Sequence, residues 1–140
     1  MSKQISAGII IKCPSGILMC HPSERPFREG HYDIPKGHVE EGEDFLESCV
    51  RELKEETGLK ITDISTIQDL GRFKYIPNKK DLYLFRLDLD HDINVAKLKC
   101  TSMFTSKISG RELPEMDGYV LSDDVNMLFP RLANVIKDLI

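Results

Sequence analysis

The sequence predicts a single α/β domain that spans residues 1–140, and three observations support this fold class. The chain has 140 residues, of which 41% are hydrophobic and 30% are charged, which is the size and balance of one folded domain. Short apolar or alternating runs, typical of β-strands, occur in both halves of the chain. Helix start and stop signals mark one segment in the middle and another at the C-terminal end.

The N-terminal part is predicted to form a β-hairpin followed by a long loop. Residues 5–13 and 16–20 are β-like runs, and the Pro-Ser-Gly sequence between them is typical of a turn. Residues 21–38 are rich in proline, glycine and charge, which predicts a loop with a short extended piece at residues 32–34. Long loops in compact domains are often functional, so this segment is a candidate functional loop.

The clearest helix is predicted over residues 44–57. Asp44 and Glu47 stand in capping-box positions, and Gly58 is placed to close the helix in the left-handed conformation. Four residues form an apolar arc that would pack the helix against a sheet: Leu46, Cys49, Val50 and Leu53.

Strand patterns dominate the second half of the chain. Strands are expected at residues 62–70, 71–75, 81–89 and 118–121, with a turn at residues 77–80. Pro130 is typical of a first helical turn and predicts a terminal helix that ends at Ile140. Residues 91–113 fit no single element, and they are interpreted either as a substrate-shaping insertion or as an irregular pair of strands.

The composition excludes several classes of protein. No apolar run approaches the roughly 20 residues that cross a bilayer, and we identify no signal peptide. The net charge of −4 argues against a domain whose main role is to wrap nucleic acid. The four cysteines form no C-x-x-C pair, so we expect reduced thiols in a cytoplasmic protein: Cys13, Cys20, Cys49 and Cys100.

Three carboxylates crowd one stripe of the predicted helix. Glu52, Glu55 and Glu56 share a face because three- and four-residue spacings return to the same side of a helix. Like charges at these spacings repel, so the cluster needs either open water or a counter-charge. The first interpretation is a solvated surface. The second is a divalent-cation site, and its oxygen ligands favour Mg²⁺ or Mn²⁺ over zinc.

The residues around this cluster decide between the two interpretations. Residues 37–59 match every position of the pattern G-x5-E-x7-R-E-U-x-E-E-x-G-U, in which U is a bulky aliphatic residue. The matching residues are Gly37, Glu43, Arg51, Glu52, Leu53, Glu55, Glu56, Gly58 and Leu59. This pattern resembles the box of the Nudix hydrolases. The resemblance implies an α/β/α sandwich with a mixed β-sheet, in which the box folds as a loop-helix-loop.

The resemblance also implies a reaction and a metal site. Nudix hydrolases cleave a nucleoside diphosphate linked to another moiety, with water attacking phosphorus while divalent cations neutralise the pyrophosphate. Transferred to this chain, the resemblance assigns the metal to Glu52, Glu55 and Glu56, with help from the backbone carbonyl of Gly37. Mg²⁺ is the expected cofactor, and Mn²⁺ is an expected substitute.

Four residues are assigned to the catalytic framework. Arg51 is expected to orient the neighbouring glutamates and to form an ion pair with Glu43. In Nudix enzymes the proton acceptor is either a box glutamate or a glutamate on a distant loop. Glu55 and Glu115 are the respective candidates here, and the sequence leaves the choice open.

The segment after the box is similar to the diadenosine polyphosphate hydrolases, the asymmetrical bis(5'-nucleosyl)-tetraphosphatases. Tyr75 follows Leu59 by sixteen residues, a spacing associated with this subgroup. The favoured substrate is therefore diadenosine tetraphosphate, cleaved to ATP and AMP. Phosphate or adenine contacts are expected from His31, Lys36, Tyr75, Lys79, Lys80 and Tyr119. A functional role is favoured for Lys36, beside the box glycine, whereas an ordinary strand or turn role is the alternative for Tyr75 and for Lys79 and Lys80.

Other substrates and another class remain open. ADP-ribose or a nucleoside-diphosphate sugar is less favoured, because the proline expected about fifteen residues past the box is Lys74 here. The 5' end of RNA would need nearly the same chemistry, although no stable nucleic-acid partner is expected. A non-catalytic nucleotide-binding module is the alternative from a different class, and it is disfavoured because every box carboxylate is present. The sequence does not determine the oligomeric state.

Overall fold

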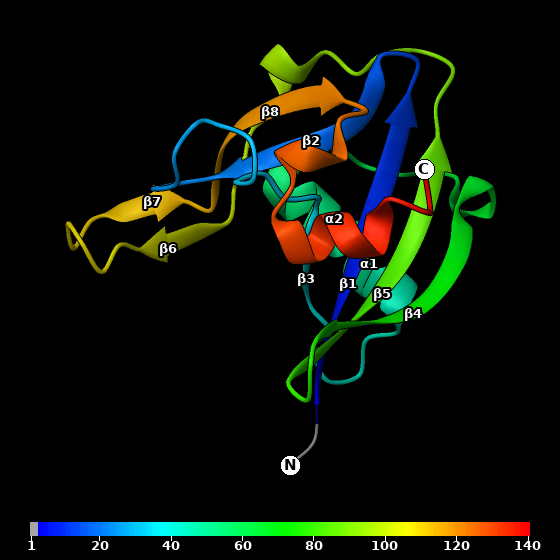
Figure 1. The fold of residues 1–140 in the computed structure, drawn as a ribbon, viewed down its shortest axis with the longest axis horizontal. Coiled ribbons are helices and arrows are strands. Elements are labelled where there is room, and N and C mark those ends of the chain that lie inside the picture. The colour runs from blue at the N-terminus through cyan, green and yellow to red at the C-terminus, as the bar shows by residue number, and fades with distance from the viewer. Residues whose placement is uncertain (1–2) are drawn as a thin grey trace.

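The computed structural model describes residues 3–140, which form a mixed β-sheet with a helix on each face (Figure 1). The elements, in chain order, are β1 (Gln4–Cys13), β2 (Gly16–Pro22), β3 (Lys36–His38), α1 (Phe45–Thr57), η1 (Ile64–Thr66), β4 (Gln68–Ile76), β5 (Lys80–Asp88), η2 (Val95–Lys97), β6 (Met103–Thr105), β7 (Glu112–Pro114), β8 (Met116–Ser122), η3 (Val125–Met127) and α2 (Pro130–Ile136).

The main sheet has the strand order β4-β5-β1-β2-β8, and β3 pairs with the beginning of β1. Strands β1 and β5 are parallel over a register that runs from Gln4 opposite Lys80 to Lys12 opposite Asp88, and the other pairs are antiparallel. Strands β6 and β7 form a separate two-stranded hairpin that projects from the rest of the molecule (Figure 1).

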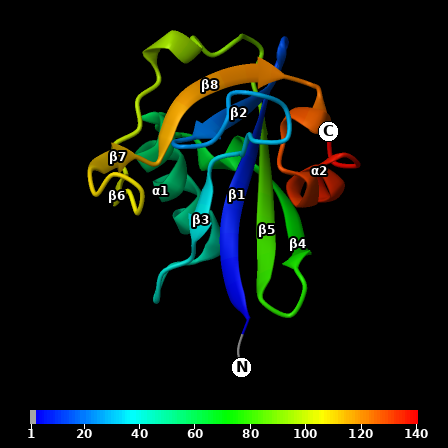
Figure 2. The ribbon, with the colours of Figure 1, turned by 60° about the vertical axis from the view of Figure 1, so that its left-hand side comes forward.

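Alternation along the central strand β1 supplies both hydrophobic layers. Ile9 and Ile11 pack with Leu53 of α1 on one face of the sheet. Ile10 belongs to the opposite face, where it clusters with Leu132 of α2. Successive side chains of a strand point to opposite faces, so one apolar strand anchors both helices. Figure 2 shows α1 and α2 on opposite sides of the sheet, which confirms the predicted α/β/α sandwich.

Several predicted elements are confirmed. The first two strands form the expected hairpin, and α1 begins after Asp44, whose side chain accepts a hydrogen bond from the backbone N–H of Glu47 at 2.7 Å. Gly58 ends this helix in the left-handed conformation, with φ of 82°. The turn at residues 77–79 is present, and Asn78 adopts the positive φ that asparagine tolerates.

Four predictions of secondary structure need correction. Residues 64–66 form a turn of 3-10 helix instead of strand, because the Asp63 side chain accepts a hydrogen bond from the Ser65 N–H and competes with strand pairing. The two strands expected at 62–70 and 71–75 are one strand, β4, with a bulge near Gly71.

The loop at residues 21–38 contains a short third strand at its end, and the terminal helix ends at Ile136 instead of Ile140. The unassigned stretch 91–113 holds η2, β6 and the start of β7. The four cysteine thiols are free and buried. Within residues 3–140, no helix has the length and apolar character needed to cross a bilayer.

Candidate active site

Helix α1 presents its acidic face to β3 at the margin of the sheet. Cys49 and Leu53 are fully buried against β1 and hold the helix in place. Glu52 and Glu56 lie one helical turn apart on the adjoining stripe, and both are buried. Packing of the apolar arc therefore fixes the carboxylates that the box pattern singles out.

Arg51 is the centre of the ion-pair network. Its Nε and Nη2 donate to the two carboxylate oxygens of Glu43 at 2.7 and 3.0 Å, a bidentate pair that confirms the predicted partner. Its Nη1 donates to Glu52 at 2.9 Å and to Glu55 at 3.2 and 3.3 Å. The hydrogen bonds from Arg51 lower the pKa of Glu43 to about 2. One guanidinium therefore offsets the repulsion among three carboxylates.

Gly37 is packed against Glu52. A Cβ atom at position 37 would lie 2.1 Å from Cδ of Glu52, so only glycine fits without displacing that carboxyl group. The box glycine thus determines where Glu52 can stand. Its backbone carbonyl is the oxygen that the Nudix resemblance assigns to the metal.

Glu56 is hydrogen-bonded to the backbone of strand β3. The backbone N–H of Lys36 donates to its Oε1 at 2.9 Å, and its side chain is almost fully buried. Burial raises the pKa of Glu56 to about 9 and that of Glu52 to about 7. Ionising either carboxyl group in this buried position therefore costs free energy, and a cation beside it would offset that cost.

The oxygen ligands of the box have the chemistry that suits a hard divalent cation. In this structure, however, Glu52 and Glu55 accept hydrogen bonds from Arg51. Within residues 3–140, no group of three His, Cys, Asp or Glu side chains is arranged to hold a metal ion. Glu52 and Glu55 both face the guanidinium instead. Two buried carboxylates with raised pKa and one adjacent backbone carbonyl are oxygen ligands of the kind that Mg²⁺ and Mn²⁺ prefer. The assignment of the metal ligands stays a prediction.

A cavity of about 400 Å³ opens beside Glu56. It lies between the loop after β2, the β6-β7 hairpin and the start of β8. Its lining combines carboxylates, cations and one aromatic ring: Pro22, Ser23, Arg25, Asp33, Lys36, Glu56, Phe104, Glu115 and Met116. Glu115, the distant-loop glutamate predicted as a candidate base, therefore shares the cavity with a box glutamate.

Lys36 lies in the same cavity and is strongly held. Its Nζ lies 3.2 Å from Oδ2 of Asp33 and 5.5 Å from the centre of the Tyr75 ring. Burial alone would lower the pKa of Lys36, but Asp33, together with the charges of Tyr75 and Glu56, raises it above its ordinary value, so the ammonium stays charged. Two of the residues predicted to bind substrate are thus in contact with one another.

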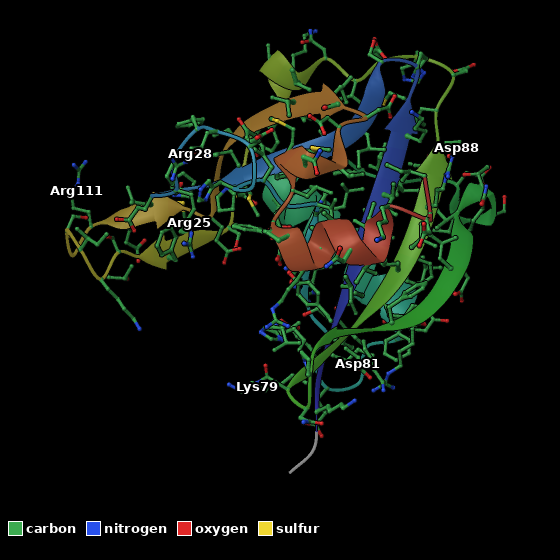
Figure 3. The ribbon with its side chains drawn as sticks, in the orientation of Figure 1. Arg25, Arg28, Lys79, Asp81, Asp88 and Arg111 are labelled. Carbon is green, nitrogen blue, oxygen red and sulfur yellow. The ribbon has the colours of Figure 1, made fainter. Side chains whose placement is uncertain are left out.

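The other predicted substrate residues lie at different distances from this cavity. The Tyr119 hydroxyl donates to the backbone carbonyl of Glu56, and His31 packs edge-on to Phe129, with ring centres 6.4 Å apart. Burial lowers the pKa of Lys80, and the positive charge of nearby Lys36 lowers it further. Lys79 lies on the exposed turn between β4 and β5, far from the loop that carries Arg25 (Figure 3).

Three charged or aromatic residues of the cavity were not predicted from the sequence as site residues: Arg25, Asp33 and Phe104. Asp33 stands in the short extended piece of the loop, and its spacing of three from Lys36 is the signal that could have indicated an ion pair. Arg25 is one of several charges in the loop, and no pattern distinguishes it. Phe104 falls in the stretch that had no predicted element.

Comparison with known proteins settles the family. The family model described as the NUDIX domain matches residues 2–117. The chain belongs to the NUDIX family. This membership identifies it as an enzyme of the Nudix hydrolase type, which acts on phosphoric anhydride bonds. The Nudix box is therefore residues 37–59, the segment that places Gly37 against Glu52.

Curated relatives cover the chain to different extents. A 17.7 kDa protein of the e-segB intergenic region of Enterobacteria phage T4 is 34% identical over 125 residues, which are 85% of this chain and 82% of the phage protein. The asymmetrical bis(5'-nucleosyl)-tetraphosphatase of Rattus norvegicus is 33% identical over 69 residues. That match spans 46% of this chain and about half of the rat enzyme, 47%.

Solved Nudix structures share the fold over nearly the whole chain. The MutT protein from Methanosarcina mazei Go1 has a TM-score of 0.65 and 18% identity, covering 99% of this chain and 94% of that one. A C. elegans Ap4A hydrolase binary complex has a TM-score of 0.60 and 18% identity, covering 96% and 94%. At these identities the likeness concerns the fold alone.

Proposed function

We propose that the protein is a Mg²⁺-dependent hydrolase of nucleoside diphosphates linked to another moiety, with diadenosine tetraphosphate as substrate and ATP and AMP as products. The observation that carries this proposal is the cavity whose lining combines Glu56 and Glu115 with the cations Lys36 and Arg25. The partial similarity to the rat asymmetrical tetraphosphatase supports the choice of substrate. A small nucleotide is thus the proposed partner.

The charges in the cavity suit a long polyphosphate. A tetraphosphate chain carries about four negative charges, more than one or two divalent cations neutralise comfortably beside two carboxylates. Lys36 and Arg25 add two positive charges to the lining of the cavity, and the Lys36 ammonium is paired with the Asp33 carboxylate 3.2 Å away. Lys80, near Lys36, adds a third at a greater distance.

Glu52, Glu55, Glu56 and the carbonyl of Gly37 would hold the metal. A bound Mg²⁺ supplies Lewis-acid neutralisation of the phosphate oxygens and lowers the pKa of the attacking water. Arg51 and Glu43 position the metal ligands. Their bidentate pair fixes the guanidinium of Arg51, which in turn donates a hydrogen bond to Glu52.

We assign the proton acceptor to Glu115. The carboxylate of Glu55 accepts two hydrogen bonds from Arg51, whereas Glu115 lines the cavity together with Glu56. In hydrolysis the water oxygen forms a bond to phosphorus, its proton passes to the Glu115 carboxylate, and the bridging P–O bond breaks. The electron pair of that bond leaves with the departing phosphate.

A product analysis tests this proposal. The purified protein with Mg²⁺ is offered diadenosine tetraphosphate, ADP-ribose, nucleoside triphosphates and 5'-triphosphorylated RNA, and the products are separated by ion exchange. We expect ATP and AMP from the tetraphosphate at a rate well above the others. A preference for another substrate would overturn the tetraphosphate assignment and leave the Nudix chemistry standing. No turnover at all would favour the non-catalytic nucleotide-binding module.

A further inference from the structure

The aromatic residues predicted to contact adenine have other partners in this structure. The ammonium group of Lys36 lies 5.5 Å from the centre of the Tyr75 ring and covers one of its faces. The Tyr119 hydroxyl is bonded to the carbonyl of Glu56. Phe104 is the one aromatic ring in the lining of the cavity that holds Glu56 and Glu115.

Strand alternation directs Phe104 into the cavity. In the β6-β7 hairpin, Phe104 pairs with Leu113. Its neighbours Met103 and Thr105 are exposed, whereas Phe104 is half-buried. Because successive side chains of a strand face opposite sides, Met103 lies on the outer face of the same strand.

Hydrogen bonds tie the hairpin to the helix that carries the box. The backbone N–H groups of Thr101 and Ser102 donate to the carbonyl of Glu55 at 2.7 and 3.3 Å. Further along, the N–H of Glu115 donates to the carbonyl of Ser102 at 2.8 Å. The base of the hairpin is thus fixed relative to the box glutamates, and Phe104 follows that base by two residues.

The loop opposite the hairpin is fixed in the same way. The Ser106 hydroxyl donates to Glu24 at 2.8 Å, and the N–H of Ser23 donates to the carbonyl of Glu115 at 3.0 Å. These bonds hold Arg25, whose guanidinium lies 5.9 Å from the centre of the Phe129 ring. Figure 3 shows Arg25 next to the β6-β7 hairpin, while Arg111 extends from the outer end of that hairpin.

We infer that Phe104 is a base-stacking residue, which binds the nucleobase of the substrate while Arg25 and Lys36 bind its phosphates. This inference rests on the proposed function, because it names the group that the catalytic cavity recognises. The cavity lining combines one aromatic ring, the two cations and the box carboxylate Glu56, which match a base, its phosphates and the reacting anhydride. Stacking on an aromatic ring is a general mode of nucleobase recognition and tolerates different bases.

The test compares binding of a nucleotide with binding of the same phosphate without a base. Fluorescent etheno-AMP is titrated into wild-type protein and into F104A, F104W and M103A, in a chain whose lack of tryptophan leaves the wild-type background low. Ribose 5-phosphate, measured by calorimetry, is the ligand without a base. M103A is the matched control, since it removes a large side chain from the outer face of the same strand.

We expect F104A to raise the dissociation constant for etheno-AMP by about 5- to 100-fold. F104W restores binding, and M103A retains the wild-type value. Ribose 5-phosphate binds wild type and F104A equally. Equal affinity of wild type and F104A for etheno-AMP would overturn the inference, and so would an equal loss of both ligands. These titrations measure binding and not turnover. Their outcome therefore stays interpretable even if the product analysis rejects diadenosine tetraphosphate as the substrate.

Discussion

Gly37 packs against the carboxyl group of Glu52: a Cβ atom added at position 37 would lie 2.1 Å from Cδ and 2.2 Å from Oε1 of that side chain. The end of a glutamate side chain can move, so G37A is expected to fold but to displace Glu52. We predict a loss of kcat of about 100-fold, because displacement of a catalytic group by about 1 Å has effects of this size. Steady-state kinetics with diadenosine tetraphosphate, or the best substrate of the panel, measure it.

The fold of G37A is checked by thermal unfolding of the metal-free protein, which should melt within a few degrees of wild type. Wild-type turnover by G37A would contradict the role assigned to this contact.

Glu56 is predicted to couple Mg²⁺ binding to stability. A ligand that binds the folded state stabilises it by about 2.7 kcal/mol at a hundred times its dissociation constant, so Mg²⁺ should raise the Tm of wild type. In E56Q the amide oxygen can still accept the Lys36 N–H, but the negative charge is gone. We expect E56Q to melt normally without metal and to lose most of the Mg²⁺ shift. E41Q, an exposed neighbour of the box helix, is the control that keeps it.

Glu115 is predicted to affect turnover without affecting metal binding. General-base catalysis contributes about 10²- to 10⁴-fold, so E115Q should lower kcat within that range. The Mg²⁺ shift of its Tm should match that of wild type. The control is E112Q, which alters an exposed carboxylate of β7, three residues before Glu115. If E55Q abolished turnover while E115Q retained it, the proton acceptor would be Glu55.

Asp81 gives the fold a pH-dependent contribution outside the site. Its carboxylate accepts a hydrogen bond from Nε of Arg72 at 2.7 Å, and Lys3 lies 3.4 Å away, so the pKa of Asp81 is lowered in the folded protein. A lowered carboxyl pKa stabilises the fold above the unfolded value of about 3.9 and loses this effect as the pH falls through the folded value. D81N should therefore lower Tm at pH 7.

The difference between D81N and wild type should shrink as the pH falls through the lowered pKa of Asp81, because below it the carboxylate is protonated in both states. D88N is the matched control on the same strand, because its Arg86 pair is half-exposed and such pairs contribute little. The two aspartates lie at opposite ends of β5 (Figure 3). An equal loss for D81N and D88N at pH 7 would contradict the argument.

Local signals made the box helix predictable. Its start at Asp44 and its end at Gly58 depend on capping interactions within a few residues, and the face that carries Glu52 and Glu56 follows from helical spacing. The Arg51–Glu43 pair was predictable because both residues belong to one short pattern. The alternating strand β5 and the first hairpin were predictable for the same reason.

Contacts between distant segments were not predictable. Phe104 reaches the cavity because Thr101 and Ser102 bond to the carbonyl of Glu55, and no residue type in 91–113 indicates a backbone contact of this kind. The short strand β3 exists because β1 offers it a partner, not because its three residues favour strand. Likewise, the polar residues near Asp63 bond to their own backbone, which converted a predicted strand into a turn.

The parallel pairing of β1 with β5 also bears on how the chain folds. These two strands form the middle of the sheet, yet the whole Nudix box lies between them in sequence. Until β5 reaches β1, the apolar residues of β1 have the β2 hairpin as their nearest local partner, and the cluster around α1 lacks Phe85 and Leu87 of β5. Closing so long a loop is slow compared with forming a hairpin. Glu52, Glu55 and Glu56 share a face through local helical spacing, but we expect their helix to dock on a complete sheet only after β5 has paired with β1.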